Sequence, residues 1–198
     1  GKAYESMAQL SMFLVTAVVS GLVAFVFASR TESQRQALER LATLDSLTGV
    51  PNRRAMEQEL QIAVAEHRRE GTAYGLAMLD LDHFKGINDE HGHEAGDEVL
   101  IAFARLVACS TRKVDRIFRF GGEEFVLLMP ATHVDGLHAI DASVRARVAE
   151  QLDCRGRAVT VSIGAASLRP DEDWQAWMSR ADAALYMAKR QGRNRTVV

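Results

Sequence analysis

Two adjacent glutamates, Glu123 and Glu124, follow a pair of glycines between two apolar runs, 116–120 and 125–129. Two strands joined by a glycine turn have this pattern. Such a turn lifts both carboxylates out of a buried sheet, where they can hold a hard cation while a phosphate approaches the backbone. An ordinary solvated hairpin loop has the same composition, so the turn needs support from elsewhere in the chain.

Asp80 and Asp82 form a second acidic cluster, where the apolar run 74–80 ends. Side chains alternate along a strand, so these two carboxylates share a face. Open α/β sheets commonly bind ligands at strand ends. Pairing of this strand beside the hairpin makes Asp80 and Glu123 converge, and two carboxylates with room for phosphate oxygens make a magnesium site. The alternative is a turn rich in Asp, Gly and Asn.

The segment 91–97 places two histidines and Asp97 around Gly92 and Gly96. Asp97 is either the N-cap of the following helix or an acceptor for the two adjacent N–H donors of a guanine, which one carboxylate can receive together. The histidine pair lacks a cysteine or a third ligand, which disfavours zinc.

Lys189 and Arg193 lie four residues apart, at the end of a predicted helix and just beyond it. Two cations there either complement the helix dipole or hold the outer phosphates of a nucleotide.

Helices alternate with strands in the part of the chain that carries these residues. Helices are predicted over 54–69, 97–108, 134–152 and 173–191, and strands over 74–80, 116–120, 125–129 and 158–166, with an edge strand at 196–198. This order, with one hairpin, predicts an α/β sandwich of mixed strand pairing. Gly49 and Pro51 break the preceding helical pattern, so the globular domain is predicted to span 45–198.

The composition fits one globular domain plus an additional segment, with 198 residues of which 47% are hydrophobic and 25% charged. A net charge of −2 provides no basic field for nucleic acid. Cys109 and Cys154 lack a CxxC partner and are predicted to be reduced core residues.

The additional segment contains no charged residue from Ser6 to Ser29. Its apolar run is long enough for a membrane helix, predicted within 1–29 with residues 10–29 in the bilayer. A signal peptide and a buried helix are the alternatives. Arginines after this run favour the inner membrane, with the C-terminal globular domain in the cytoplasm. Residues 30–44 are predicted to form a linker helix that pairs with a second copy.

Ordered motifs cover the whole predicted domain. They are 45–53 (DSLTGVPNR), 80–85 (DLDHFK), 88–89 (ND), 92–97 (GHEAGD), 121–125 (GGEEF), 161–164 (VSIG) and 184–194 (ALYMAKRQGRN). Together they resemble the GGDEF family, the diguanylate cyclases. Glu123 stands where the family name has Asp, and Val50 replaces a usual Leu. The resemblance implies a mixed central sheet flanked by helices, similar to adenylyl cyclases and polymerase palms, in a homodimer that joins two GTP molecules into cyclic di-GMP.

The resemblance also implies roles for individual residues. Asp80, the Leu81 carbonyl and Glu123 match the positions that bind Mg²⁺ or Mn²⁺, and Glu123, supported by Glu124, matches the proposed base for the 3′-hydroxyl. The guanine-reading positions match Asn88 and Asp97, with His93 among them. The positions around the phosphates match Phe84, Lys85, Lys189 and Arg193.

Arg112 and Asp115 match the family's RxxD product-inhibition site, although such a pair taken alone is usually only surface charge. Two other functions compete with an active cyclase. A catalytically dead domain that binds GTP or cyclic di-GMP would lack Asp80 or Glu123, and both are present. An enzyme that makes a mixed purine dinucleotide would call for something other than a carboxylate at position 97, and the acid of Asp97 favours guanine.

Overall fold

The structure is a computed structural model that describes residues 12, 20–22, 25, 27 and 43–198. Residues Thr43–Val198 form one compact unit. Its elements, in chain order, are α2 (Arg53–Glu70), β1 (Tyr74–Leu81), α3 (Phe84–His91), α4 (His93–Ser110), β2 (Arg116–Gly121), β3 (Glu124–Pro130), α5 (Val134–Ile140), the π-helical turn η1 (Asp141–Arg145), α6 (Ala146–Gln151), β4 (Asp153–Cys154), β5 (Arg157–Ala158), β6 (Val161–Ser167), α7 (Trp174–Arg190) and β7 (Thr196–Val197).

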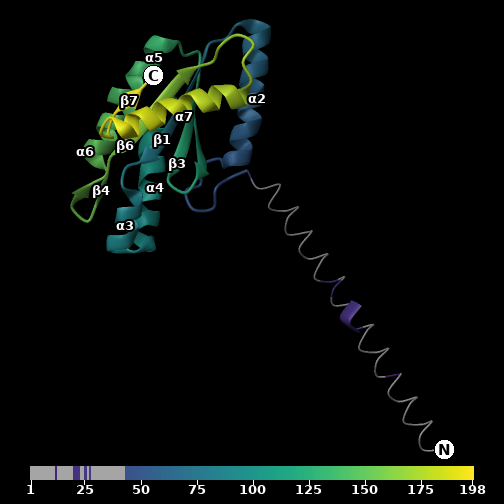
Figure 1. Ribbon diagram of the computed structural model, residues 1–198, viewed down its shortest axis with the longest axis vertical. Coiled ribbons are helices and arrows are strands. Elements are labelled where there is room, and N and C mark those ends of the chain that lie inside the picture. The colour runs from purple at the N-terminus through teal and green to yellow at the C-terminus, as the bar shows by residue number, and fades with distance from the viewer. Residues whose placement is uncertain (1–11, 13–19, 23–24, 26, 28–42) are drawn as a thin grey trace, which may run out of the picture. The chain divides into compact units, whose positions relative to one another are not determined.

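A five-stranded sheet in the order β2-β3-β1-β6-β7 forms the centre of this unit (Figure 1). The pairs of β1 with β3, β1 with β6 and β2 with β3 are antiparallel, whereas β6 and β7 are parallel. Every residue of the central strand β1 is buried. The predicted α/β fold with a mixed central sheet is therefore confirmed.

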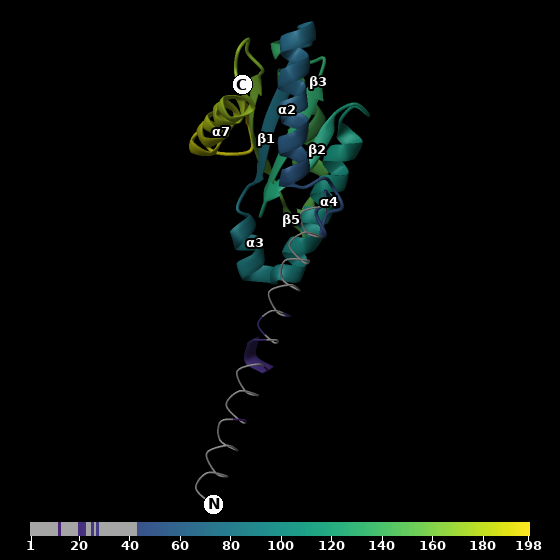
Figure 2. The same ribbon diagram turned by 90° about the vertical axis from the view of Figure 1, so that its right-hand side faces the viewer.

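The two faces of the sheet carry separate hydrophobic cores, as the period of two along β1 requires. Leu76 and Met78 pack with side chains of α2 and α7, and Figure 2 shows α2 running along this face of the sheet. Ala77 and Leu79 point the other way, into the core formed with α3, α4, α5 and α6. The sequence of β1 is a nearly continuous apolar run because helices cover both faces of the sheet at this strand.

Helix ends follow local capping chemistry. The side chain of Asn52 accepts a hydrogen bond from the Ala55 N–H at the start of α2, and Gly71 ends that helix in the left-handed conformation. Asp173 caps α7 in the same way as Asn52, through the Ala176 N–H.

Three parts of the fold differ from the sequence-based prediction. Residues 84–91 form α3, and α4 begins at His93 rather than at 97. Asp97 therefore lies inside α4 and is not its N-cap. The predicted helix 134–152 is divided into α5 and α6 by the π-helical turn, and the small hairpin of β4 and β5 precedes the strand predicted at 158–166.

The predicted location in the inner membrane is wrong. Among the residues that the structure describes, no helix is both long and apolar enough to cross a membrane. Most of the predicted span 10–29 lies outside the described residues, as do residues 30–42 of the predicted linker helix. Leu44, at the end of that predicted helix, forms a β-bridge with Pro51.

Gly164 in β6 lets α7 pack directly on the sheet. A Cβ atom there would lie 2.0 Å from the Leu185 backbone nitrogen and 2.3 Å from the Ala181 carbonyl oxygen, and neither backbone atom can move without moving the helix. We expect Gly164→Ala to lower the free energy of unfolding by about 3 kcal/mol, the upper range for overpacking.

Gly86 in α3 is the matched control for that substitution, because a Cβ atom there meets nothing within 4 Å. Gly86→Ala should raise the free energy of unfolding by about 0.5–1 kcal/mol through helix propensity. Urea unfolding followed by circular dichroism measures both changes. Equal stability of the parent and Gly164→Ala would contradict the close packing of α7 on β6.

Candidate active site

Three carboxylates meet where β1 ends and β3 begins. Asp80 is directly opposite Glu124 in the register of these strands. The Leu81 N–H donates to the Glu123 carbonyl oxygen over 3.4 Å. Asp80 is only 6% exposed, whereas Glu123 and Glu124 are half-buried. The pairing of β1 with β3 therefore brings together the acidic residues that the sequence places 43 and 44 positions apart (123 − 80 and 124 − 80).

A cation from α7 completes this acidic site. The Lys189 Nζ lies 2.7 Å from the Asp80 Oδ2. Arg193 follows in the loop after α7, and its charge also acts on Asp80. Two cations thus face the carboxylates from the C-terminal end of a helix, and they can bind phosphate oxygens there.

All three carboxyl groups have raised pKa values. Burial is the largest cause for each of them. The charge of Asp82 further raises the pKa of Asp80, and the charge of Asp80 raises the pKa of both Glu123 and Glu124, while Lys189 opposes each shift. Burial and the neighbouring carboxylates both disfavour the ionised forms of these groups, so a bound cation would stabilise the charged cluster.

Arg119 fixes the glycine turn that carries Glu123. Gly122 has a φ of 52°, which favours glycine. The Nε and Nη2 of Arg119 donate to the Gly122 carbonyl oxygen over 3.1 and 2.8 Å, and its Nη1 donates to the Asp45 carboxylate over 2.9 Å. Burial acts to raise the pKa of Asp45, but hydrogen bonds from Thr48 and Arg119 outweigh it and hold this pKa below 3.8. The start of the domain is thereby bonded to the glycine turn.

The predicted guanine-reading residues lie where α3 packs against α4. A Cβ atom at Gly96 would be 2.0 Å from the Asn88 Oδ1 and 3.1 Å from the Phe84 Cζ, so only glycine allows this approach. The half-buried Asn88 is thus held beside the residue that precedes Asp97. Phe84 is buried and is a core residue of this contact.

Three other predicted substrate residues are solvent-exposed, namely Lys85 on α3 and His93 and Asp97 on α4. The structure thus leaves all three side chains accessible to a ligand.

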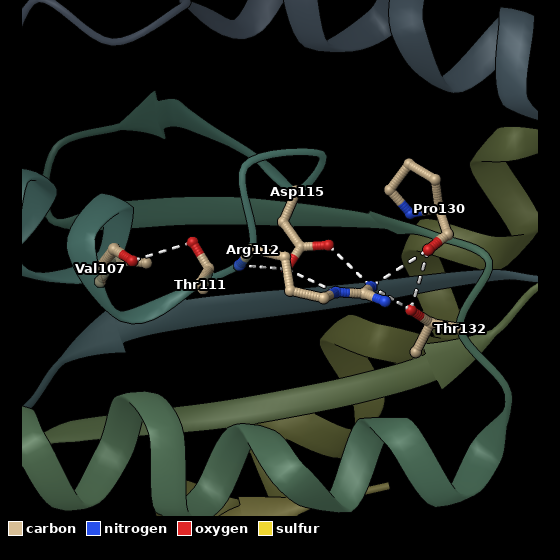
Figure 3. A network of polar contacts seen from close by, with 6 residues as sticks. All are labelled: Val107, Thr111, Arg112, Asp115, Pro130 and Thr132. Carbon is tan, nitrogen blue, oxygen red and sulfur yellow. Dashed lines mark hydrogen bonds and ion pairs between the residues drawn. The ribbon is translucent and has the colours of Figure 1, made fainter.

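Arg112 and Asp115 form a separate polar network in the loop before β2 (Figure 3). The Arg112 Nη2 lies 2.8 Å from the Asp115 Oδ1 and also donates to the Pro130 carbonyl oxygen and the Thr132 Oγ1, over 3.1 and 2.6 Å. Arg112, Asp115 and Thr132 line a pocket of about 530 Å³ together with His133 and Asp135. This pocket and the acidic site lie at opposite ends of β2.

Sequence reasoning missed three residues of these networks. Arg119 and Thr132 were not selected, and Asp82 was noted only for its position on the strand. An arginine within an otherwise apolar strand was the available signal for Arg119. The buried Thr132 carries no such signal, because its role depends on a contact with a residue 20 positions away.

Comparison with known sequences identifies the family. The sequence model described as "Diguanylate cyclase, GGDEF domain" matches residues 42–195. The chain belongs to the GGDEF family.

Curated relatives of this GGDEF domain include two diguanylate cyclases. The chain is 43% identical over 175 residues to DgcP from Pseudomonas aeruginosa, which covers 87% of the chain and 26% of DgcP. It is 41% identical over 169 residues to DgcM from Escherichia coli, which covers 84% of the chain and 41% of DgcM. The chain thus spans less than half the length of either relative.

Solved GGDEF structures share the fold. The coiled coil and GGDEF domain of DgcB from Caulobacter crescentus, in complex with c-di-GMP, aligns with a TM-score of 0.75 and 36% identity over 88% of this chain and 94% of that one. The active GGEEF domain of a diguanylate cyclase from Vibrio cholerae aligns with a TM-score of 0.70 and 35% identity over 74% and 95%.

The acidic site of this GGDEF domain offers oxygen ligands that suit a divalent cation. Among the described residues there is no group of three or more His, Cys, Asp or Glu side chains that could hold a metal. The predicted ligand set has only two carboxylates, Asp80 and Glu123, with the Leu81 carbonyl. Such a set fits Mg²⁺ bound together with substrate phosphates, because Mg²⁺ is usually held by one or two carboxylates plus phosphate oxygens.

The raised pKa of Glu123 predicts a pH-dependent effect of Glu123→Gln on stability. At neutral pH the ionised Glu123 destabilises the folded state, so Glu123→Gln should raise the melting temperature. The gain should shrink as the pH falls from the raised pKa through the usual value of 4.5, because below that value the carboxyl is neutral in both the folded and the unfolded state. Thermal melts from pH 4 to 8, with Glu150→Gln as the exposed control, measure it. A gain that is independent of pH would contradict the raised pKa of Glu123, whose largest cause is burial.

Proposed function

We propose that this chain is the catalytic domain of a diguanylate cyclase, which condenses two GTP molecules into cyclic di-GMP and releases pyrophosphate. The observation that carries this proposal is the position of the buried Asp80 beside Glu123 and Glu124, with Lys189 against it. Family membership supports it, as do the activities named for DgcP and DgcM. An active GGEEF domain from Vibrio cholerae supports the glutamate at position 123.

In the proposed reaction, the 3′-oxygen of one GTP attacks the α-phosphorus of the other. Glu123 accepts the 3′-hydroxyl proton, and Glu124 supports it. A bound Mg²⁺ or Mn²⁺ would be held by Asp80, the Leu81 carbonyl and Glu123, and it supplies stabilisation of the charge on the phosphates. Lys189 and Arg193 hold the outer phosphates, so Lys189 exchanges its contact with Asp80 for one with the substrate.

In this proposal, residues of helices α3 and α4 bind the guanine base. Asp97 accepts from the two adjacent N–H donors of the base, and Asn88 bonds the same edge. His93, Phe84 and Lys85 lie around this site. The packing of Asn88 against Gly96 fixes the amide beside the Asp97 backbone, which supports a single orientation of the base.

Each domain binds one GTP in this proposal, so two copies of the chain must face each other in a homodimer. The reacting 3′-oxygen and α-phosphorus come from different nucleotides, and one acidic site holds only one triphosphate. Turnover per chain should therefore rise with chain concentration.

Product inhibition is proposed for the pocket at Arg112 and Asp115. Arg112 already has its guanidinium fixed by Asp115 and Thr132, which lowers the entropy lost when a planar fork binds guanine or phosphate. The position of this pocket at the far end of β2 means that product there need not displace GTP. It acts by favouring an unproductive arrangement of two domains.

Replacement of Glu123 tests the catalytic proposal. We expect Glu123→Gln to reduce the formation of cyclic di-GMP from GTP and Mg²⁺ at least about 100-fold, the scale of a lost electrostatic contact in the transition state. Glu150→Gln, an exposed substitution on α6, should keep the parent rate. The assay separates nucleotide products over a dilution series of the chain. Near-normal turnover by Glu123→Gln, or a parent rate per chain that is independent of dilution, contradicts the proposal.

Replacement of Arg112 tests the inhibitory site. Arg112→Ala should leave the initial rate intact and abolish the slowing caused by added cyclic di-GMP. The matched control is Arg116→Ala, which removes an exposed arginine four residues away that pairs with Glu59 on α2. Rates are measured with and without added product. If product still inhibits Arg112→Ala as strongly as the control, the inhibitory site lies elsewhere.

A further inference from the structure

Asp82 is a buried carboxylate to which the proposed mechanism gives no role. It is 4% exposed, two residues beyond Asp80. Its Oδ1 accepts from the Ser162 Oγ over 2.7 Å, and its Oδ2 accepts from the Thr160 Oγ1 over 2.7 Å and from the Asn194 N–H over 3.0 Å. Both oxygens are therefore used, and one bond reaches a loop 112 residues away in sequence.

That loop has an unfavourable backbone conformation. Arg193 and Asn194 have φ values of 62° and 43°, in the left-handed region that L-residues rarely adopt. Asparagine tolerates this region better than arginine does. Two consecutive residues of this kind persist only where surrounding contacts determine the conformation. The bond from the Asn194 N–H to Asp82 is such a contact.

The loop is anchored on both sides of this bond. The Arg193 N–H donates to the Ala188 carbonyl oxygen at the end of α7 over 3.1 Å, and the Ile163 N–H donates to the Arg195 carbonyl oxygen over 3.0 Å. Asp82 fixes the residue between these anchors. The hydroxyls of Thr160 and Ser162 in turn orient its carboxylate, so the backbone of Arg193 has a defined place relative to β1.

We infer that Asp82 is a positioning residue that fixes the turn carrying Arg193 toward the triphosphate. This inference rests on the proposed function. Two carboxylates at the end of β1 then have different roles. Asp80 faces the reacting phosphate, and Asp82, two residues later, holds the loop whose Arg193 binds the outer phosphates. The charge of Arg193 acts on Asp80, which supports this placement.

Nucleotide binding separates positioning from a general structural role. The probes are a GTP analogue with a methylene group between the α- and β-phosphorus atoms, which cannot release pyrophosphate, and GMP, each with Mg²⁺. We expect Asp82→Ala to weaken analogue binding about tenfold, as the loss of a charge-assisted contact would, and GMP binding less than about twofold. Arg193→Ala should give the same pattern, and the double variant should bind no more weakly than Arg193→Ala alone.

Asp153→Ala is the matched control. Asp153 accepts from the Gly156 N–H over 2.7 Å and holds a turn that also contains a left-handed residue, Arg155, away from the acidic site. Asp153→Ala should leave the binding of both the GTP analogue and GMP unchanged. Asp82→Asn should recover most of the analogue affinity, because its amide can donate to the Ser162 hydroxyl while its oxygen still accepts from Asn194.

Thr160→Val provides a second test if Asp82→Ala does not fold, since it removes one orienting donor and keeps the carboxylate. It should weaken analogue binding at least about twofold and leave GMP binding unchanged. Equal loss of both nucleotides in the Asp82 or Thr160 variants, or additive losses in the double variant, overturns the inference alone. Failure of the parent to bind the analogue overturns the proposed function and the inference with it.

Discussion

The register between β1 and β3 is the constraint on which the acidic site depends. It places Asp80 opposite Glu124 at the end of a strand that is buried on both faces. A shift by one residue would turn Asp80 into the opposite core and expose Leu79 or Leu81 instead. The two hydrophobic cores that pack on β1 therefore hold the charged site in place, because neither core tolerates the alternative register.

Like charges in this site must be offset from outside the two strands that carry them. Lys189 supplies a counter-charge from α7, a helix whose close approach to the sheet depends on Gly164. Arg119 holds the turn before β3, and Asp82 holds the loop after α7. Each of the three residues belongs to a different segment, so the geometry of the site results from tertiary contacts and not from one local motif.

Most of the fold and the acidic residues could be predicted from the sequence because they follow from patterns within a few consecutive residues. The apolar run ending at Asp80 and the glycine turn before Glu124 are readable because strand burial and turn chemistry act over a few residues. Helix α3 was missed because residues 84–91 contain Gly86 and Asn88, which are poor helix formers, and its stability comes from packing on α4. The bonds of Asp82 and Thr132 span 112 and 20 residues, beyond the reach of any local pattern.

The bonds of Arg119 have a consequence for the stability of individual segments. They join the Asp45 carboxylate to the Gly122 carbonyl oxygen, and the Arg119 N–H also donates to the Pro51 carbonyl oxygen. Residues 45–52 and the glycine turn are thus one cooperative unit for local opening, although about 70 residues separate them in the chain. Local unfolding of the first ten residues of the domain would break these bonds and release the turn that carries Glu123. The acidic site is therefore ordered only when the start of the domain is ordered.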